Sequence, residues 1–495
     1  MDLRRSFEQL AAQLGPGYIT PSIYDTAWIA RLASLDIPMG KRALEWIRNH
    51  QLPDGSWGTW GVSYHHERLV CTLASITALA AQRDIRDQQA IRRAQSALEI
   101  HASGLRADPA GDTIGFEMIV PALLSEAVSL GALRLESIFF GDLLKRRKAK
   151  LAALPDGMIN RYVTVAFSTE MISAEEKRLL DLDRLREPNG SVACSPASTA
   201  WYMLNIEPDD AALQYLESII VDAESDEPAL VPYIAPIDVF EVAWALWNLG
   251  LTDLVNDEEL LARCQHQVDF LEQNWQPGLG VSAVSPLSLV DGDTTAMVYD
   301  VLVQFGRSPC LDDVLVYEEE SCFRCFKIEA DKSVSTNVHV LGALRRAGLD
   351  KKHTVVKKVR TFLRDKLKLG AYWFDKWHAS PYYTTSHAII ACAEYDNALV
   401  ETAAGWLIQT QHDDGSWGYY TSTAEETAYC LQALVFWHRS GQYVPKDTLI
   451  RGEDWLLDHM TDSFPPLWIG KCLYSPVLAV QAAILSALKL LDETL

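Results

Sequence analysis

Residues 411–418 read QHDDGSWG, and residues 51–58 read QLPDGSWG, a near copy in the other half of the chain. The Asp-Gly step of each copy predicts a tight turn. The Gln and Trp that flank this step are suited to tie the end of one helix to the start of the next through hydrogen bonds and packing. One copy in each half indicates two related helical domains.

The segments around these copies resemble one another and have helical spacing. Each has a Thr or Ser near its start, followed by Ala, aromatic residues and Leu, and runs with strand-like alternation are scarce, so we predict an essentially all-α fold. Such repeats bury their apolar faces only by stacking, which produces solenoids or closed helical toroids. The segments are 67–80, 195–204, 239–250, 294–306, 335–348 and 424–437.

Turn-forming residues mark a domain boundary near the middle of the chain. The segment 276–280 reads QPGLG, and we place the boundary at its end. This predicts a first domain over 15–280 and a second over 281–495. A short N-terminal helix within 1–14 is expected to pack on the second domain.

The charge balance excludes some partners. The 495 residues carry 66 acidic and 44 basic side chains, a net charge of −22, which argues against nucleic acid or an anionic membrane as the main partner. No run approaches the roughly 18 apolar residues of a membrane span, and the N-terminus lacks a secretory signal, so we expect a cytoplasmic protein. An anionic substrate would need a local cluster of Lys, Arg or metal ion.

Two carboxylates begin an apolar segment in the second half. Residues 289–300 read LVDGDTTAMVYD, with Asp291 and Asp293 two positions apart. Burial and a neighbouring carboxylate both disfavour ionisation, so one of the pair is expected to hold a proton above the usual carboxyl pKa. That group would be a Brønsted acid facing an apolar pocket. The alternative, which spacing alone favours, is a helix N-cap assisted by Thr294 or Thr295.

Motifs along nearly the whole chain resemble those of class II diterpene cyclases. Within that family the chain is most similar to the bacterial halimadienyl diphosphate synthase type, and it is related to copalyl diphosphate synthases and, more distantly, to squalene-hopene cyclases. Besides the two DGSW copies, the motifs are SIYDTAW (22–28), TIGFEMIVPALL (113–124), NGSVACSPASTAWY (189–202), VDGDTTAM (290–297), FRCF (323–326), DKWHASPYYTTSHAI (375–389) and AEETAYCLQAL (424–434).

The resemblance implies a fold and a reaction. The fold is two α/α barrels in the γβ arrangement, without a class I α domain, and with the active site between the barrels. The reaction is the cyclisation of geranylgeranyl diphosphate, started by protonation, with the diphosphate retained. The resemblance gives Asp293 the role of acid and Asp291 a supporting one, and Thr294 departs from the third Asp of most members. His339 resembles a triterpene cyclase histidine that hydrogen-bonds the acid, although a lone His on an apolar helix is more often a core residue.

A carbocation needs a dry pocket lined with π faces that stabilise it without attacking it. The 15 Trp and 18 Tyr of the chain suit that need. The resemblance puts Trp377, Tyr382 and Tyr383 in the pocket wall, and Trp201 and Trp244 are further candidates. Barrel packing is the alternative for each of them.

The resemblance also points to the product. Phe167 and Tyr233 occupy the positions at which plant copalyl diphosphate synthases carry a His and an Asn that remove the final proton through a water. Without that base, hydride and methyl shifts have time to run. We therefore predict a rearranged bicycle of the halimadienyl or clerodane type. The alternatives are copalyl diphosphate and a drimenyl-type product from farnesyl diphosphate.

Family members bind the diphosphate with magnesium at an acidic stretch before the GFE segment. Here only Asp108 and Asp112 precede Gly115, a degenerate version, so Mg²⁺ binding is predicted there with a solvated loop as the alternative. Lys150 and Lys376 are the basic candidates for the diphosphate.

Other classes of protein that this sequence could belong to require different features. A class I synthase needs a complete metal motif, which 312–316 lacks, and squalene-hopene cyclases are longer and dock on membranes. A prenyltransferase β subunit requires bound zinc, and a helical-repeat scaffold would turn over no prenyl diphosphate. A cyclised diphosphate would pass to a separate class I synthase, transferase or phosphatase.

Overall fold

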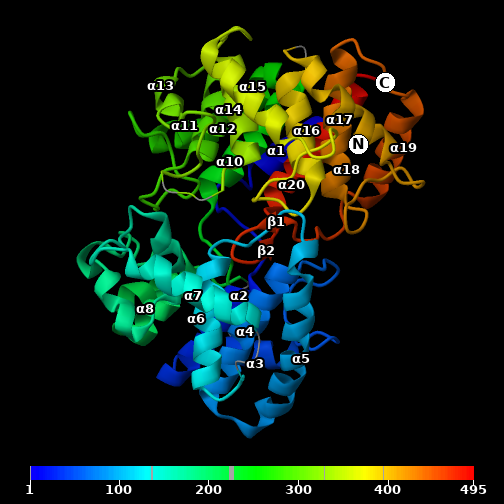
Figure 1. Ribbon diagram of the computed structural model, residues 1–495. Coiled ribbons are helices and arrows are strands. Elements are labelled where there is room, and N and C mark those ends of the chain that lie inside the picture. The colour runs from blue at the N-terminus through cyan, green and yellow to red at the C-terminus, as the bar shows by residue number, and fades with distance from the viewer. Residues whose placement is uncertain (1, 135–137, 222–227, 328, 330, 394) are drawn as a thin grey trace.

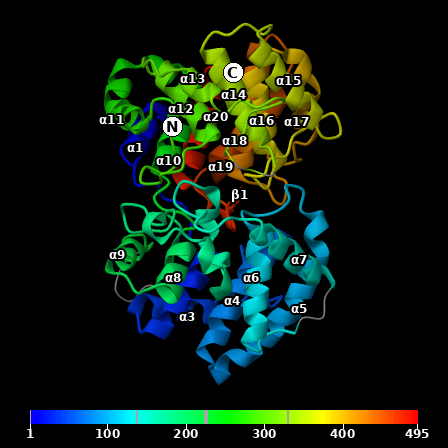
Figure 2. The ribbon, with the colours of Figure 1, turned by 60° about the vertical axis from the view of Figure 1, so that its left-hand side comes forward.

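The computed structural model of the protein describes residues 2–134, 138–221, 228–327, 329, 331–393 and 395–495. The chain forms two helical bodies that lie one above the other, with a short β-hairpin between them (Figures 1 and 2). Both bodies are α/α barrels, as the sequence predicts.

The second barrel is a closed ring of six inner helices with an outer layer around it. Each inner helix contacts the next, and the last contacts the first. The inner helices are α10 (Asp238–Gly250), α12 (Gly292–Gln304), α14 (Val334–Arg346), α16 (Pro381–Cys392), α18 (Ala424–Arg439) and α20 (Val477–Asp492). The outer helices are α1 (Leu3–Ala11), α11 (Glu258–Asn274), α13 (Asp312–Leu315), α15 (Thr354–Lys366), α17 (Asn397–Gln409) and α19 (Lys446–His459).

Composition separates the two layers. All twelve residues of α16 are buried, as expected for an inner helix that is covered on every side. The outer α15 buries only Val356, Val359, Phe362 and Leu363, one stripe at helical spacing. The recurrent Ala, Ser and Thr of the inner segments let neighbouring helices approach closely.

The first barrel closes with a 3₁₀ segment as one member of its inner ring. This segment, Thr164–Met171, contacts α6 and α8 and completes the circle. The inner helices are α2 (Ile23–Arg31), α4 (His65–Gln82), α6 (Phe116–Ser129) and α8 (Pro196–Asn205), and the outer ones are α3 (Pro38–Asn49), α5 (Gln88–Gly104), α7 (Ile138–Ala152) and α9 (Asp210–Ser218). Shorter 3₁₀ turns span Leu32–Leu35, Ile85–Asp87, Leu105–Ala107, Ala174–Leu179, Leu182–Arg184 and Asp253–Asn256.

The boundary predicted at residue 280 is wrong. Helix α10 contacts α12 and α20, and α11 contacts α1, α10 and α12, so both helices belong to the second barrel. Without α10 the second ring would be open between α12 and α20. The turn at 276–280 only joins outer α11 to inner α12, and the boundary lies before Asp238. Helix α1 packs on α11 and α20 through Phe7, Leu10 and Ala11.

The DGSW copies join helices as predicted. The Trp57 indole N–H donates to the Ile47 carbonyl at 2.9 Å, and the Gln51 amide donates to the Ala90 carbonyl at 2.8 Å. These bonds connect the last turn of α3 to the first turn of α5. The second copy repeats both bonds, from Trp417 to Leu407 and from Gln411 to Thr448.

The hairpin between the barrels consists of β1 (Trp468–Ile469) and β2 (Leu473–Tyr474). Ile469 and Leu473 share an apolar cluster with Val62 and Tyr64 of the first barrel, so the hairpin is part of the interface. Among the described residues, no helix combines the length and apolar character needed to cross a membrane.

Candidate active site between the barrels

Both carboxylates of the predicted acid pair lie at the N-terminus of α12. Asp291 is the N-cap, and its Oδ1 accepts the Thr294 backbone N–H at 2.7 Å. Burial, together with the nearby charge of Asp293, raises the pKa of Asp291 to about 7. The N-cap alternative and the raised carboxyl pKa therefore both hold for the same residue.

Asp291 makes the stability of the protein depend on pH. A folded pKa of about 7 against an ordinary value of 3.8 means that burial favours the neutral acid, so stability falls as pH rises between these values. The slope is at most about 1.4 kcal/mol per pH unit. Asp291→Asn keeps an oxygen to cap the helix but does not titrate. Its free energy of unfolding should therefore rise by about 2–3 kcal/mol relative to that of the wild type when the pH is raised from 5 to 8. Denaturant unfolding at both pH values measures this, and an unchanged difference would contradict it.

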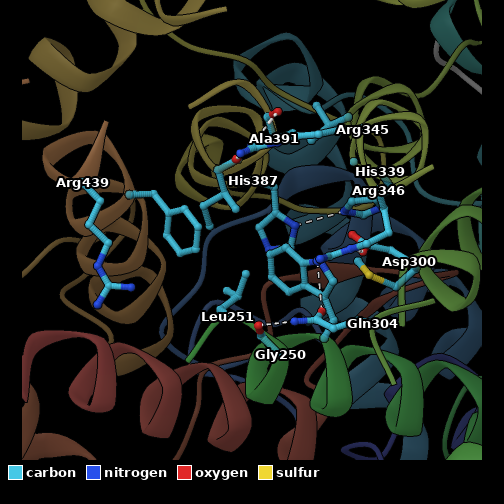
Figure 3. Close-up of a pocket in the computed structure, with 16 residues that line it drawn as sticks. Gly250, Leu251, Asp300, Gln304, His339, Arg345, Arg346, His387, Ala391 and Arg439 are labelled. Carbon is cyan, nitrogen blue, oxygen red and sulfur yellow. Dashed lines mark hydrogen bonds and ion pairs between the residues drawn. The ribbon is translucent and has the colours of Figure 1, made fainter. Parts of the chain in front are cut away.

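Asp293 contacts the predicted histidine. Asp293 Oδ1 lies 2.7 Å from Nδ1 of His339, which α14 carries. The Asp293 side chain retains 14% exposure, whereas that of His339 is buried. On its other edge, Nε2 of His339 lies 3.0 Å from Nδ1 of His387 on α16 (Figure 3). The carboxyl group is therefore oriented from behind by a chain of two imidazoles.

A continuous series of aromatic rings runs from His339 across the interface into the first barrel. Ring centroids of successive members, starting from His339, are 4.0 to 6.3 Å apart. We call this series the aromatic wall. In order from His339, it consists of Trp244, Phe240, Trp468, Tyr474, Tyr233 and Phe167.

Tyr383 supports the aromatic wall at the end near the acid. Its ring centroid lies 4.7 Å from that of Trp468, and its hydroxyl accepts the Trp244 indole N–H at 3.0 Å. Burial raises the pKa of Tyr233, Tyr383 and Tyr474 well above that of an exposed phenol, so all three stay neutral. The wall thus offers π faces with no anionic oxygen.

Not every predicted aromatic residue belongs to the wall. Tyr382 instead stacks on Trp406 of outer helix α17 at 4.9 Å, because successive helical residues point about 100° apart. Trp201 packs in the core of the first barrel. For both residues the packing alternative is correct. The ring centroid of Trp377 lies 6.3 Å from that of Phe326, the last residue of the FRCF segment.

The sequence did not reveal the residues that complete the wall. Phe240 lies four positions before Trp244, a spacing that puts both on one face of a helix. This was the one usable signal, and the two rings stack at 4.0 Å. Trp468 and Tyr474 lie in a hairpin whose strands are only two residues long, which is too short for a periodic pattern in the sequence.

A buried ion pair anchors the first-barrel end of the wall. Lys471, at the hairpin turn, is fully buried, with Nζ 2.6 Å from Glu170 Oε1 and donating to Ser195 Oγ at 2.7 Å. Its ammonium lies 4.4 Å from the ring centroid of Phe167. Glu170 and Ser195 belong to the first barrel, so this lysine ties the hairpin to the first barrel beside Phe167.

The two basic candidates have acidic partners. Lys376 Nζ lies 3.2 Å from Glu329 and 4.8 Å from the Trp377 ring centroid. Glu329 accepts the Cys325 backbone N–H, and Cys325 contacts Asp291, so Lys376 lies near the acid pair. Lys150, on α7, pairs with Glu117 at the start of α6.

The predicted magnesium ligands face a histidine. His66 Nδ1 lies 2.7 Å from Asp108 Oδ2, and His66 Nε2 lies 3.0 Å from Asp112 Oδ1. Burial opposes protonation of His66, but hydrogen bonds to both carboxylates outweigh it and raise its pKa. Within the described part of the chain, no group of three or more His, Cys, Asp or Glu side chains is arranged so that it could hold a metal ion. Asp108 and Asp112 therefore do not fit Mg²⁺, because an imidazole fills the space between them.

Known proteins share this architecture. The chain is 43% identical over 98% of its length to a type B diterpene cyclase of Mycobacterium tuberculosis, of which 98% is matched. It is 31% identical to an ent-copalyl diphosphate synthase of a Streptomyces species, over 95% of this chain and 92% of that protein. A family model of the squalene-hopene cyclase C-terminal domain matches residues 327–462.

Solved structures agree with these matches. The ent-copalyl diphosphate synthase from Streptomyces platensis superposes with a TM-score of 0.81 at 30% identity, covering 99% of this chain and all of that one. The superposition spans both barrels of this chain, so the two proteins share the two-barrel fold. Identity of this extent over the full length leaves no doubt about descent: the chain belongs to the class II diterpene cyclases.

Proposed function

We propose that the protein cyclises geranylgeranyl diphosphate to a rearranged bicyclic diphosphate. The main support for this proposal is the contact between Asp293 and His339 at one end of an aromatic wall that crosses the barrel interface. Asp293 gives its proton to the terminal double bond, and the next two double bonds attack the cations that form in turn. No bond to the diphosphate breaks, so the product retains it.

Each side chain of the acid end has a separate task. Asp291, whose pKa of about 7 keeps a neutral form available, caps the helix and limits negative charge beside Asp293. Thr294 donates its backbone N–H to Asp291, and His339 orients the Asp293 carboxyl group. A preorganised acid of this kind contributes to rate because it needs no rearrangement when the proton moves.

The aromatic wall carries the cation and keeps water away from it. The wall runs from Trp244 to Phe167, and Tyr383 packs against it near Asp293. Trp377, whose ring lies beside Phe326, is a further candidate for the pocket lining. Indole and phenol faces attract a cation without forming a bond to it. An enclosed apolar surface also prevents hydration of the intermediate before ring closure is complete.

The residues at the far end favour a rearranged product. Phe167 has no basic atom, and burial raises the pKa of the Tyr233 phenol so that it stays protonated. Their rings pack edge to face at 6.0 Å. A first bicyclic cation beside these two side chains keeps its proton long enough for hydride and methyl shifts, which gives a halimadienyl or clerodane skeleton. The diterpene cyclase name of the 43% identical relative supports a twenty-carbon substrate.

Product analysis tests this proposal. The purified protein is incubated with geranylgeranyl or farnesyl diphosphate and Mg²⁺, the products are dephosphorylated, and gas chromatography with mass spectrometry and NMR identifies them. We expect a rearranged bicyclic alcohol from the twenty-carbon substrate. Unrearranged copalol would overturn the product assignment, a product from farnesyl diphosphate alone would point to a drimenyl-type cyclase, and no product from either would favour a scaffold.

The diphosphate is proposed to bind near Lys376 and Lys150, with Mg²⁺ as its counterion. Both lysines have acidic partners, Glu329 and Glu117, that the diphosphate would have to replace. If the diphosphate binds together with Mg²⁺, the metal neutralises part of its negative charge, so fewer basic side chains are needed to bind it. A retained diphosphate then serves as the leaving group for a class I synthase, as the donor for a transferase, or as the substrate of a phosphatase.

Asp112→Asn tests whether the acidic pair holds magnesium. Asp112 is 60% exposed and faces His66, so we expect the Mg²⁺ concentration for half-maximal activity to stay within about twofold of the wild type. Asp156→Asn, at an exposed carboxylate of the same barrel, is the matched control. A rise of about tenfold or more for Asp112→Asn alone would contradict this and assign the metal to Asp112.

A further inference from the structure

His387 extends the contact between acid and histidine by one more imidazole. It is buried on α16, and its ring stacks on Trp247 at 4.6 Å. Its Nδ1 lies 3.0 Å from His339 Nε2. Its Nε2 is a buried polar atom with no hydrogen-bond partner among the described residues. An imidazole that is bonded on one edge and unsatisfied on the other requires explanation, because buried polar atoms are normally paired.

A cavity of about 440 Å³ adjoins this histidine (Figure 3). Its lining includes His387 and His339 together with charged and polar side chains, which are Asp300, Gln304, Arg345, Arg346 and Arg439. The Arg346 and Arg439 side chains are 37% and 35% exposed, so the cavity reaches the protein surface at these residues. A polar cavity of this size holds several water molecules.

The cavity and the acid lie on opposite sides of His339. Asp293 is in the first turn of α12, whereas Asp300 and Gln304 lie in its last turns. A rise of eleven helical residues separates Asp293 from Gln304 by about 16 Å. His339 contacts Asp293 with Nδ1 and lines the cavity, while Asp293 is not part of the lining. The two histidines therefore bridge a polar compartment and the aromatic wall.

We propose that His387 and His339 form a proton relay that reloads Asp293 from this cavity after each turnover. The inference rests on the proposed role of Asp293 as the acid. Each cyclisation removes a proton from Asp293, and the product cation loses its proton at another position. The wall has to exclude water while a cation is present, so a supply route behind the acid keeps the replacement proton apart from the reacting chain. The only described contact of Asp293 on that side is His339.

The hydrogen bonds define the transfer atom by atom. After turnover, the Asp293 carboxylate takes the proton on His339 Nδ1, and His339 Nε2 takes the proton on His387 Nδ1. Cavity water then gives a proton to His387 Nε2, and the hydroxide that remains is neutralised by bulk solvent. Each imidazole gains one proton and loses one, and rotation of the rings restores the starting tautomers.

The surroundings of His387 suit this role. Burial lowers the pKa of His387 well below its usual value, and the neighbouring His339 and His378 act in the same direction, so the resting imidazole is neutral with a free lone pair. Tyr383 and Tyr429 also pack against its ring, at 4.3 and 5.7 Å. Burial raises the pKa of both phenols, so they stay protonated and offer no competing base.

A comparison of the first turnover with later turnovers tests the relay. Glutamine at position 387 retains hydrogen bonding but does not take up a proton. With enzyme in excess over geranylgeranyl diphosphate, His387→Gln should complete one turnover within about twofold of the wild-type rate, because Asp293 is already loaded. With substrate in excess, the steady-state kcat should fall by about tenfold or more, with KM unchanged and a burst of one equivalent.

Two further variants separate relay from structure. His387→Ala enlarges the cavity, and added imidazole should restore its steady-state rate without changing its first turnover. His101→Gln removes a buried imidazole of the first barrel and should leave both rates at wild-type values. A first turnover slowed as much as kcat, or a kcat equal to that of the wild type, would overturn the relay. A wild-type protein that forms no product at all would instead reject the proposed function.

Discussion

Asp293→Asn is expected to lower kcat by about 10³-fold or more, because an amide has no acidic proton to give to an alkene. The substitution keeps the size of the side chain and an oxygen that accepts a hydrogen bond from His339, whose Nδ1 lies 2.7 Å away in the wild type. Binding of the prenyl diphosphate should remain, since the aromatic wall and the lysines are untouched. Product formation measured with radiolabelled geranylgeranyl diphosphate gives the rate, and calorimetric titration gives the affinity.

Asp291→Asn is the matched control for this loss. It removes a carboxylate of the same pair while leaving an acceptor for the Thr294 N–H. We expect a smaller loss of kcat, about 10- to 100-fold, because Asp291 supports the acid and does not itself deliver the proton. Near-normal activity of Asp293→Asn, or a greater loss in Asp291→Asn, would move the role of acid to Asp291.

Lys471→Met is expected to destabilise the protein by about 3–5 kcal/mol. The substitution leaves the Glu170 carboxylate buried with Tyr24 and Ser198 hydroxyls as its remaining partners. An uncompensated buried charge is the costly outcome, whereas removal of both charges is often neutral. The double variant Lys471→Met with Glu170→Gln should therefore recover most of the lost stability.

Unfolding experiments on both variants measure this effect. A two-barrel protein need not unfold in one step. Hydrogen exchange at residues 468–474 should therefore be measured in addition to the denaturation midpoint. Lys489→Met removes a lysine that forms ion pairs near the surface and should cost at most about 1 kcal/mol. A loss of that small size in Lys471→Met would show that the buried pair does not hold the barrels together.

Local patterns in the sequence were enough for the fold class and for one end of the site. The helical spacing of the inner segments and the two DGSW copies predict two related helical domains, because each helix and each turn is encoded within a few residues. The resemblance added that both are α/α barrels. Asp291 and Asp293 were identified for the same reason, since two residues of spacing put both at one helix terminus. The resemblance to class II cyclases then pointed to His339, although no spacing links it to the pair.

Only the tertiary structure decided the rest. Trp244 meets Tyr383 across 139 positions, and Lys471 meets Ser195 across 276, separations over which periodicity carries no information. The true domain boundary, the aromatic wall, the insertion of His66 between Asp108 and Asp112, and the second imidazole behind Asp293 all arise this way. Inner and outer helices alternate along the chain, and closure of the ring brings the inner helices together. The fold therefore determines which of the many buried aromatic and polar side chains become neighbours.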